Sequence, residues 1–547
     1  MHQGLGEAFV ENRDVESARD YHESTKLAYI NLRNKPPIYK SYTGLPFVPL
    51  PTGFDPPGCS TLEAVAGAGS RDGTRSLDLD FLAQLLHFSA GLVRKQVLPV
   101  AGDVHYRAAA SAGALFPVEV YLVTGDIPDL KAGVYHFSPS GPALTQLREG
   151  DYRRELVEAT AEDPRIAAAP VTLVLSAIFW RSSWKYRARG YRYCYWDAGT
   201  ILANALAVAR GGADFPISLV AGFEDQRVNR LLDISPDREA SLCLVPIGTD
   251  DRAQTAAPPL DAAPLNVQVT DGLDSEISYP EIIRTHANSC LTTKEEVLAW
   301  RSNGRSDASS DPPYAGIPLG QGIGPRLDVE DLKAAPLSAT ILQRGSTRRF
   351  GRESISSSQF GIILDASTRN LPADFLGKEA GSLLEAYIIV NAVQGLTPGA
   401  YFFSPMERRL ALLKQGDFRE EAGHLCFEQA LGADASVVVY FMVPLDQVLE
   451  RYGNRGYRAS QLEAGIRVGN AYLCSHSLGL GATGMTFYDD EVTEFFSPHA
   501  EGKSVMFLVA VGVTHEKNRV RPFRSRVGVL QDSLARGAGS HPPAITE

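Results

Sequence analysis

Two arginines flank a serine in the five-residue segment Arg344-Gly345-Ser346-Thr347-Arg348. Guanidinium groups four positions apart, with a hydroxyl between them, can converge on the oxygens of one phosphate. An arginine-rich turn is also common on solvated surfaces, so this segment alone does not decide between the two. It lies at the start of a repeated unit, ahead of a helix-like stretch, and this position favours a phosphate site.

A second basic cluster follows the last apolar, strand-like stretch of the chain. It contains Lys517, Arg519, Arg521, Arg524 and Arg526. These side chains could close on the same phosphate or form an ordinary solvated terminus, and the sequence leaves both readings open.

Two segments in the first half of the chain could meet a flat ligand or its substrate. Residues 107–117 read RAAASAGALFP. Small side chains let the backbone approach a ligand closely, and glycine permits unusual dihedral angles, although a tight turn into a strand has the same composition. Further along, Lys185-Tyr186 lies among arginines. Without further information, such a pair is typical of the solvated face of a basic helix.

These segments belong to a chain that repeats itself. Residues 185–205 return as 451–471 with nine identical positions, at an offset of 451 − 185 = 266. Residues 133–139 recur as 399–405 at the same offset, 399 − 133 = 266. One offset maintained over such a distance predicts two copies of one domain.

Two polar residues recur within the repeat. Asp197 and Asn204 return as Glu463 and Asn470. The members of each pair lie seven residues apart, on one face of a predicted helix, so we expect structural hydrogen bonds rather than catalysis.

Composition excludes several classes of protein. The 547 residues are 44% hydrophobic and 21% charged, which is ordinary for a globular protein, and a net charge of −11 argues against a nucleic-acid partner. No stretch approaches the roughly eighteen apolar residues of a membrane span, so no membrane partner is expected. Six isolated cysteines without a C-x-x-C pair predict reduced thiols, a cytoplasmic location and no metal site.

Helix-like and strand-like segments interleave along each repeat, which predicts an α+β fold. We expect an N-terminal lead-in over 1–60, a first domain over 61–250 and a linker over 251–335. A second domain follows over 336–530, and a disordered tail over 531–547.

The ordered set of RGSTR, SAGALFP and KYRARGYRY, leading into a helix, resembles the flavin-dependent nitroreductase superfamily. More narrowly, it is similar to the SagB/ThcOx-type dehydrogenases, the azoline oxidases of thiazole- and oxazole-forming pathways. The lead-in segment YHESTK at 21–26 also resembles the opening of many such proteins. The resemblance implies a dimer with FMN at the subunit interface. Here two tandem nitroreductase-like domains would form an intrachain pseudo-dimer, so the chain is expected to be a monomer or a weak homodimer.

The resemblance also implies which residues hold FMN. The second repeat would supply the phosphate site and a segment whose backbone amides approach the flavin, and the first repeat would supply the small-residue segment over it. The expected cofactor-binding residues are Arg344, Ser346, Arg348, Arg107, Ser111, Ala112, Gly113, Ala114, Leu115, Thr483, Gly484, Met485, Arg519 and Arg521.

The second composite site, related by exchange of the repeats, is expected to be poor. Its RxSxR equivalent is RDGTR at 71–75, where the aspartate would repel phosphate. Residues 381–384 read GSLL where the SAGALFP pattern should stand, and Arg451 replaces Lys185. We therefore expect one FMN per chain.

Lys185 and Tyr186 match the Lys-Tyr pair that the azoline oxidases use in catalysis. The implied reaction is oxidation of a thiazoline or oxazoline in a peptide or carrier-bound intermediate, with a cyclodehydratase as a further partner. Azoline oxidation removes a hydride and a proton, so a base is needed near the flavin. A lysine serves as base only when its pKa is lowered, and Arg187 and Arg189 are candidate cations for this.

Three other functions are consistent with the sequence. One is an NAD(P)H-dependent nitro or quinone reductase of the same fold. Another is a flavin-free duplicated scaffold that binds a pathway partner. The third is dehydrogenation elsewhere on a peptide or amino-acid derivative.

Overall fold

The computed structural model describes most of both repeats. The described residues are 34–67, 76–98, 102–212, 215–250, 260–270, 276–303, 317–318, 334–376, 382–405 and 408–514. Four segments singled out in the sequence lie outside them: residues 21–26, residues 71–75, the basic cluster at 517–526, which includes Arg519 and Arg521, and the expected tail at 531–547.

Each repeat contains one large antiparallel sheet, with strand orders β2-β7-β6-β5-β8-β9 and β11-β14-β13-β12-β15-β17-β16. The first repeat also contains a two-stranded antiparallel sheet of β3 (Leu92–Leu98) and β4 (Gly102–Arg107). The first large sheet consists of β2 (Phe47–Pro49), β5 (Val118–Thr124), β6 (Gly133–Ser138), β7 (Ala143–Glu149), β8 (Val171–Ile178) and β9 (Glu239–Ile247). The second consists of β11 (Ile317–Pro318), β12 (Glu385–Val390), β13 (Gly399–Ser404), β14 (Arg409–Gln415), β15 (Val437–Val443), β16 (Gly481–Met485) and β17 (Ser504–Gly512). The order β7-β6-β5-β8-β9 matches β14-β13-β12-β15-β17, so the predicted duplication and α+β fold are confirmed.

The central strands are mostly apolar and buried, because both faces of each sheet are covered. Every residue of β8 and β15 is buried. Continuous apolar runs are the expected pattern for strands enclosed on two sides. The sheets therefore provide rigid supports for the helices and loops at their edges.

Matching helices follow matching strands. In the first repeat these are α3 (Leu79–Ala90), α4 (Arg153–Ala159), α5 (Pro164–Ala168), α6 (Phe179–Tyr186), α7 (Gly190–Gly212) and α8 (Asp225–Leu232). Their counterparts are α12 (Ser357–Thr368), α13 (Arg419–Leu425), α14 (Ala430–Asp434), α15 (Leu445–Tyr452), α16 (Asn454–Ser477) and α17 (Asp489–Phe496). Two shorter helices, α2 (Thr61–Ala66) and α11 (Leu337–Gln343), lie near the start of the repeats.

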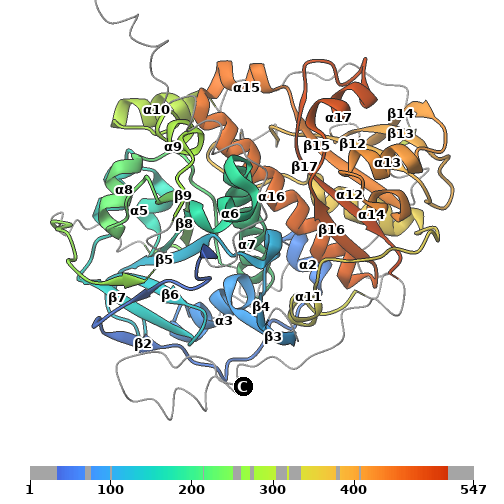
Figure 1. Cartoon of the computed structure of the whole chain (residues 1–547). Coiled ribbons are helices and arrows are strands. Elements are labelled where there is room, and N and C mark those ends of the chain that lie inside the picture. The colour runs from blue at the N-terminus through green and yellow to red at the C-terminus, as the bar shows by residue number, and fades with distance from the viewer. Residues whose placement is uncertain are drawn as a thin grey trace, which may run out of the picture.

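Helices α7 and α16 pack against each other at the centre of the molecule, between the two sheets (Figure 1). They approach most closely at Gly199 and Gly465, which are related by the offset of 266. A Cβ atom on Gly199 would lie 2.4 Å from the carbonyl carbon of Gly465, so glycine is required there. One buried apolar core runs through both repeats, and the molecule is thus an intrachain pseudo-dimer about this helix pair.

Two crossed ion-pair clusters tie the repeats together. Asp489, the first residue of α17, pairs with Arg189 and Arg192 of the first repeat. Asp225, the first residue of α8, pairs with Arg455 and Arg458 of the second. The arginines correspond at the offset of 266, so the interface keeps its two-fold design at these positions.

The segment between the repeats is partly folded. It forms β10 (Val269–Thr270), which pairs with β1 (Ser41–Tyr42), and two helices, α9 (Pro280–Ala287) and α10 (Lys294–Asn303). Helix α10 lies beside α15 (Figure 1), and among the described residues the other inter-repeat edge carries no matching pair of helices. The duplicated frame therefore carries an unpaired addition on one side.

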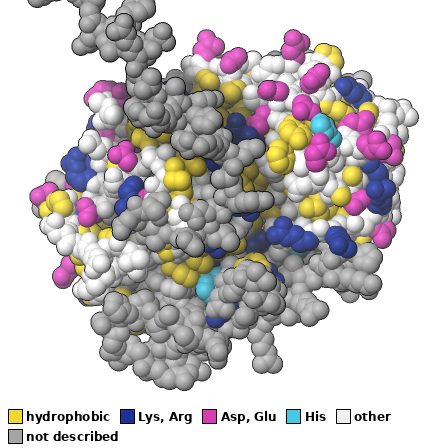
Figure 2. Space-filling view, in the orientation of Figure 1, with side chains coloured by type: hydrophobic (Ala, Val, Ile, Leu, Met, Phe, Trp, Pro, Cys, Tyr) yellow, Lys and Arg dark blue, Asp and Glu magenta, His cyan; other side chains and the backbone are white. Residues whose placement is uncertain are grey.

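The surface mixes charges of both signs, with acidic and basic side chains interspersed on the face in Figure 2. Within the described ranges, no helix is long and apolar enough to cross a membrane. All six cysteines are free thiols.

Candidate cofactor and active site

A cavity of about 220 Å³ lies between the two repeats. The lining residues of the first repeat are Ala110, Ser111, Ala112, Gly113, Tyr186, Tyr193, Trp196, Asp197 and Thr200. Those of the second are Ser346, Arg348, Gln429, Leu431, Tyr472, Thr483, Gly484, Met485, Thr486 and Phe507. We call this cavity the open site. Neither repeat could build it alone.

The small-residue segment forms a strained loop on one wall of the open site. It includes the short 3₁₀ turn η3 (Ala112–Ala114), in which Gly113 has a φ of 66°. Ala114 and Phe116 also have positive φ values, 53° and 48°, which non-glycine residues rarely adopt. Such strain needs surrounding structure to hold it and is frequent at functional sites.

Helix α7 holds this loop in place. The amide of Ala112 donates a hydrogen bond to Asp197 Oδ1 (3.1 Å). Thr200 Oγ1 donates to the carbonyl of Ala110 (2.7 Å), and the amide of Phe116 donates back to Ser111 Oγ (2.9 Å). The backbone of the loop is thereby fixed against the cavity.

Lys185 and Tyr186 meet this loop from the end of α6. A methyl group on Gly113 would lie 3.0 Å from Tyr186 Oη and 3.4 Å from Lys185 Nζ. Lys185 is exposed, whereas Tyr186 is partly buried and its ring lies 4.2 Å from that of Tyr193. Burial raises the pKa of Tyr186 well above its ordinary value, with the neighbouring Tyr193 and Asp197 acting in the same direction. The tyrosine hydroxyl therefore keeps its proton at neutral pH.

Arg187 and Arg189, the cations expected to act on Lys185, lie directly after α6. Arg189 lies in the 3₁₀ turn η4 (Arg187–Arg189) and donates to Asp489 Oδ2 (2.7 Å). Arg187 has a positive φ of 53° at the junction with α6.

The RGSTR segment forms the opposite wall. Ser346 and Arg348 line the cavity, and the amide of Thr347 donates to the carbonyl of Ala482 (3.0 Å). Arg344 instead reaches across to the first repeat, where its Nε donates to the carbonyl of Ala108 (3.1 Å). Burial lowers the pKa of Arg344 to about 10, so the guanidinium stays charged at neutral pH.

Tyr472 of α16 connects this wall to the edge strand β16. Its hydroxyl oxygen accepts from the amide of Gly484 (2.8 Å) and is 2.9 Å from Ser346 Oγ. A Cβ atom on Gly484 would lie 2.7 Å from the ring of Phe507, so this position requires glycine. No motif in the sequence distinguishes Tyr472, which lies in an ordinary helical stretch.

The remaining expected residues lie nearby or outside the described ranges. The guanidinium of Arg107 donates to the carbonyls of Ile38 (2.7 Å) and Val118 (3.4 Å). Leu115 is buried in the protein, and Ala114 closes the loop behind Gly113. The structure thus brings Ser111, Ala112, Gly113, Tyr186, Ser346, Arg348, Thr483, Gly484 and Met485 together on one cavity, with Lys185 and Arg344 beside it.

The aromatic lining of the cavity was not singled out as cofactor-binding in the sequence. Trp196 stacks on Phe507 across the two repeats, with ring centroids 4.1 Å apart and planes at 7°. Its Nε1 donates to Gln461 Oε1 (2.6 Å) on the facing helix. The aromatic spacing in RGYRYCYW was the available signal, because Tyr193 and Trp196 lie three residues apart and so on one face of α7.

The pseudo-symmetric position on the other side is occupied by the protein itself. Val220 pairs with Leu244 as Met485 pairs with Leu508, so residues 219–222 are the counterpart of 484–487. Here the backbone of 372–374 lies along this counterpart, with hydrogen bonds from Leu219 to Pro372 (2.8 Å) and from Asp374 to Leu219 (3.0 Å). The Asp374 carboxylate accepts from the amides of Ala221 and Gly222, each at 2.8 Å.

Trp300 of α10 completes this packing. Its Nε1 donates to the carbonyl of Tyr452 (3.0 Å), and its ring lies against Phe375 and Gly222. Tyr452, the counterpart of Tyr186, donates its hydroxyl to the carbonyl of Phe375 (3.0 Å). We call this position, built from Asp374, Phe375, Trp300 and Tyr452, the filled site.

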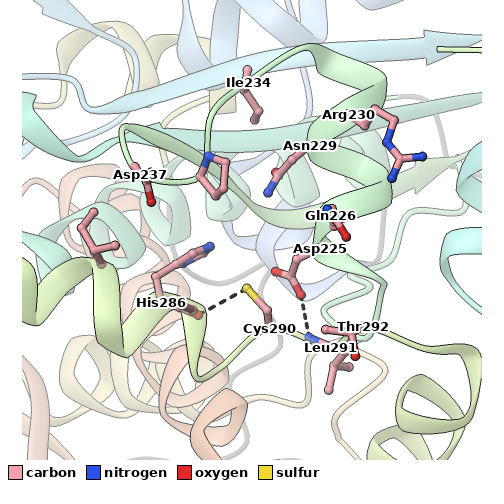
Figure 3. Close-up of a pocket in the computed structure, with 13 residues that line it drawn as sticks. Asp225, Gln226, Asn229, Arg230, Ile234, Asp237, His286, Cys290, Leu291 and Thr292 are labelled. Carbon is pink, nitrogen blue, oxygen red and sulfur yellow. Dashed lines mark hydrogen bonds between the residues drawn. The ribbon is translucent and has the colours of Figure 1, made fainter. Parts of the chain in front are cut away.

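A separate pocket of about 430 Å³ lies between α8 and α9, where Asp225, His286 and Cys290 come close together (Figure 3). Asp225 is already committed to Arg455 and Arg458 and accepts from the amide of Leu291 (2.9 Å). Burial opposes its ionisation, but the two arginines outweigh it and hold the pKa of Asp225 at about 2. A metal cation here would meet two guanidinium groups, so the cluster is better described as an inter-repeat ion pair.

The family model described as "Nitroreductase family" matches residues 73–249 and 341–513, one match in each repeat. The chain belongs to the nitroreductase family. Members of this family commonly bind flavin, and the tandem matches coincide with the two folded repeats.

Three similar proteins add detail to the family assignment. The trifolitoxin-processing protein TfxB of Rhizobium leguminosarum bv. trifolii is 30% identical over 172 residues, covering 30% of this chain and 46% of TfxB. The microcin B17-processing protein McbC of Escherichia coli is 30% identical over 151 residues, covering 26% of this chain and 54% of McbC. The chain thus spans about half the length of each of these two relatives.

A crystal structure from Anabaena variabilis, of a protein with a provisional nitroreductase name, matches almost the whole chain. It is 26% identical and superimposes with a TM-score of 0.70, covering 91% of this chain and 99% of the other. The tandem arrangement is therefore shared with another member of the family.

Proposed function

We propose that the chain is an FMN-dependent dehydrogenase that oxidises thiazoline or oxazoline rings in a peptide-derived intermediate to azoles. The observation that carries the proposal is the convergence of Lys185 and Tyr186 on Gly113 at the wall of the composite cavity. Two relatives that process peptide products, TfxB and McbC, support the substrate class. A cyclodehydratase is the partner we expect, and the free cysteines agree with a cytoplasmic location.

The residues of the open site fit a flavin mononucleotide. Ser346 and Arg348 offer a hydroxyl and a guanidinium to the phosphate, and a charge-assisted pair of this kind is the usual anchor for phosphate oxygens. Ala112, Gly113 and Gly484 line the cavity with small side chains or none, so a flat ring system could approach their backbone closely. When bound, FMN supplies the two-electron acceptor for the hydride that leaves the substrate.

The chain's own residues would manage the proton. Oxidation of an azoline ring removes one hydrogen as hydride and one as a proton, and leaves a ring double bond. Tyr186 keeps its hydroxyl proton at neutral pH, so it would orient the ring or relay a proton rather than act as the base. Lys185 Nζ, placed 3.4 Å from the Gly113 methyl position, is the group we assign to proton removal.

The wall of the cavity would exclude water from this chemistry. Trp196, Phe507 and Tyr193 present aromatic surface to the cavity, which lowers the local dielectric constant around the reacting ring. This environment would strengthen each polar contact made inside the cavity.

The test combines flavin content with substrate turnover. Protein saturated with FMN and desalted should retain the yellow flavin spectrum and convert a thiazoline-containing peptide to the thiazole, with loss of two hydrogen atoms by mass spectrometry. A protein that stays colourless would contradict the proposal and leave a flavin-free scaffold.

A second function is favoured by the nitroreductase name of the Anabaena protein, which matches 91% of the chain. An NAD(P)H-dependent nitro or quinone reductase would oxidise NADPH with a nitroaromatic acceptor and would leave azoline peptides unchanged. The same preparation therefore distinguishes the two candidates.

A further inference from the structure

Asp197 on α7 is a buried carboxyl group in the wall of the open site. Only 5% of its surface is exposed. Its Oδ1 accepts the Ala112 amide, but its Oδ2 has no hydrogen-bond partner among the described residues. A buried carboxylate oxygen without a partner is costly, because desolvation is not offset by a donor.

The corresponding carboxyl group of the second repeat, Glu463, has partners for its charge. Glu463 occupies the position equivalent to Asp197, since 463 − 197 = 266, and accepts from Ser382 Oγ (2.7 Å) and from the Leu383 amide (3.0 Å). It is also ion-paired with Arg467, whose Nε lies 2.8 Å from Glu463 Oε1. Its charge is therefore compensated within its own helix.

The first repeat lacks that cation. The counterpart of Arg467 is Ile201, since 467 − 201 = 266, and Ile201 is a buried apolar residue. Both copies carry a carboxyl group at this position, but the first has a hydrocarbon side chain where the second has the arginine. Glu463 holds its own loop while it is paired with Arg467. Holding the Ala112 loop therefore does not explain why Asp197 lacks a paired cation on α7.

Other polar groups surround Asp197 from every packed element. The loop contributes Arg107 and Ser111, α6 contributes Tyr186, and α7 itself contributes Tyr193, Cys194 and Thr200. Across the cavity the second repeat presents Ser346, Arg348 and Tyr472. Burial raises the pKa of Asp197 to about 7, against the opposing influence of the Ser111 hydroxyl, the Ala112 amide and Arg107.

We propose that Asp197 Oδ2 is the final acceptor of the proton that Lys185 removes from the substrate ring, with Tyr186 as the relay. This rests on the proposed dehydrogenase function. In the net step a ring C–H bond breaks and an O–H bond forms on Asp197. The electron pair of the broken bond becomes the new ring double bond as the neighbouring hydrogen leaves as hydride, and Lys185 and Tyr186 end unchanged.

The physical chemistry of the site favours this transfer. Burial disfavours the charged carboxylate more than the Ser111 hydroxyl, the Ala112 amide and Arg107 favour it, so protonation relieves a desolvation cost. A group that titrates near the working pH is also the most effective proton acceptor.

The test replaces Asp197 with asparagine, which can still accept the Ala112 amide but cannot ionise. We expect Asp197→Asn to retain flavin and a similar KM, to lose about a hundredfold in kcat, and to lose the rise of kcat near neutral pH. Asp197→Glu restores a carboxyl group, of the kind that the second repeat carries at this position, and should restore the pH dependence.

A second readout does not depend on activity. The infrared band of a protonated carboxylic acid should disappear as the wild-type protein is titrated from about pH 5 to about pH 9, and Asp197→Asn should lack this change. Asp374→Asn is the matched control. Asp374 is likewise buried, accepts two backbone amides and has a pKa raised by burial, but it lies in the filled site. This variant should keep the kcat profile and the Asp197 band.

The outcomes separate this inference from the proposed function. If Asp197→Asn oxidises azolines with an unchanged pH profile, Asp197 is not the proton acceptor, and the dehydrogenase function stands. If wild-type protein binds flavin but oxidises no azoline, the proposed function fails and the proton-acceptor role fails with it. In either case the infrared titration reports separately whether Asp197 exchanges a proton near neutral pH.

Discussion

The open site and the filled site are built from corresponding elements of the two repeats, but in the part of the chain that the structure describes only the open site contains a cavity. Both lie beside the α7–α16 contact, and both are bordered by an aspartate held by two arginines of the other repeat. In the open site the backbone of 484–486 faces a cavity. In the filled site the counterpart of 484–487, residues 219–222, is covered by the backbone of 372–374 and by Trp300.

Burial measures how far the sites have diverged. The side chains of Arg189, Arg192 and Asp489 are about one third exposed, at 30%, 27% and 32%. Their counterparts Arg455, Arg458 and Asp225 are only 2%, 4% and 1% exposed, beneath the segment that carries α9 and α10. The same ion pair is thus an accessible border in one site and part of the core in the other.

The comparison shows what a duplication allows that a symmetric dimer does not. Identical subunits must carry both halves of a site, whereas fused repeats can change separately. Here the first repeat keeps Lys185 and the small-residue loop, while the second keeps Ser346, Arg348 and the edge strand β16. At the other position the corresponding space is filled by Asp374, Phe375 and Trp300.

The largest expected effect separates the two lysine–tyrosine positions. Lys185→Ala should reduce azoline turnover by about 10²–10⁴-fold while the flavin spectrum remains, because the base is lost and the cofactor contacts are not. Arg451→Ala changes the counterpart, whose guanidinium donates to the Asn303 carbonyl (2.7 Å) in the filled site, and should leave turnover unchanged. Equal losses in the two variants would show that the sites are not functionally different.

The next effect concerns stability rather than activity. Trp300→Ala should lower the free energy of unfolding by about 3–5 kcal/mol, because a fully packed indole leaves a cavity against Phe375 and Gly222. Chemical denaturation measures this loss, and flavin content below the unfolding transition should not change. A second equivalent of flavin in this variant would mean that Trp300 alone blocks a competent site.

The smallest expected effect is the pH dependence of stability at Asp197. The pKa of this carboxyl is about 7 in the folded chain against an ordinary 3.8, so between these values the folded state holds a proton that the unfolded state has lost. Wild-type stability therefore falls as pH rises through this window. The Asp197→Asn variant has no such loss. In the absence of cofactor, its free energy of unfolding should exceed that of wild type by up to roughly 4 kcal/mol at about pH 8, and should be similar to wild type near pH 4. A pH-independent difference would contradict the shifted carboxyl.

Much of the fold could be predicted because the sequence contains two copies of the same domain. The apolar segments that became β5, β8, β12 and β15 are continuous enough to read as buried strands, and the offset of 266 pairs them across the repeats. Asp197 shows the limit of single-residue reasoning. It was expected to be a structural hydrogen-bonding group, and it does hold the Ala112 amide. The first repeat has Ile201 where the second has Arg467, so Asp197 lacks the ion pair that Glu463 makes within its own helix. Only a comparison of the two copies shows this difference in the sequence.

The filled site could not be predicted from the sequence. Trp300 lies in a segment of linker-like composition, and nothing in its local pattern indicates that its indole would reach Gly222. Asp374 has no counterpart motif, because its partners are backbone amides of another repeat. Contacts of this kind depend on the tertiary arrangement, which local spacing does not encode.

The number of flavins per chain tests the central claim most directly. Apo-protein equilibrated with excess FMN and then desalted can be measured by flavin absorbance against protein concentration. One flavin per chain is expected, with retention weakened about tenfold or more by Arg348→Ala through loss of a charge-assisted contact. Two flavins per chain, or one whose retention does not depend on Arg348, would contradict a single cofactor site shared between the repeats.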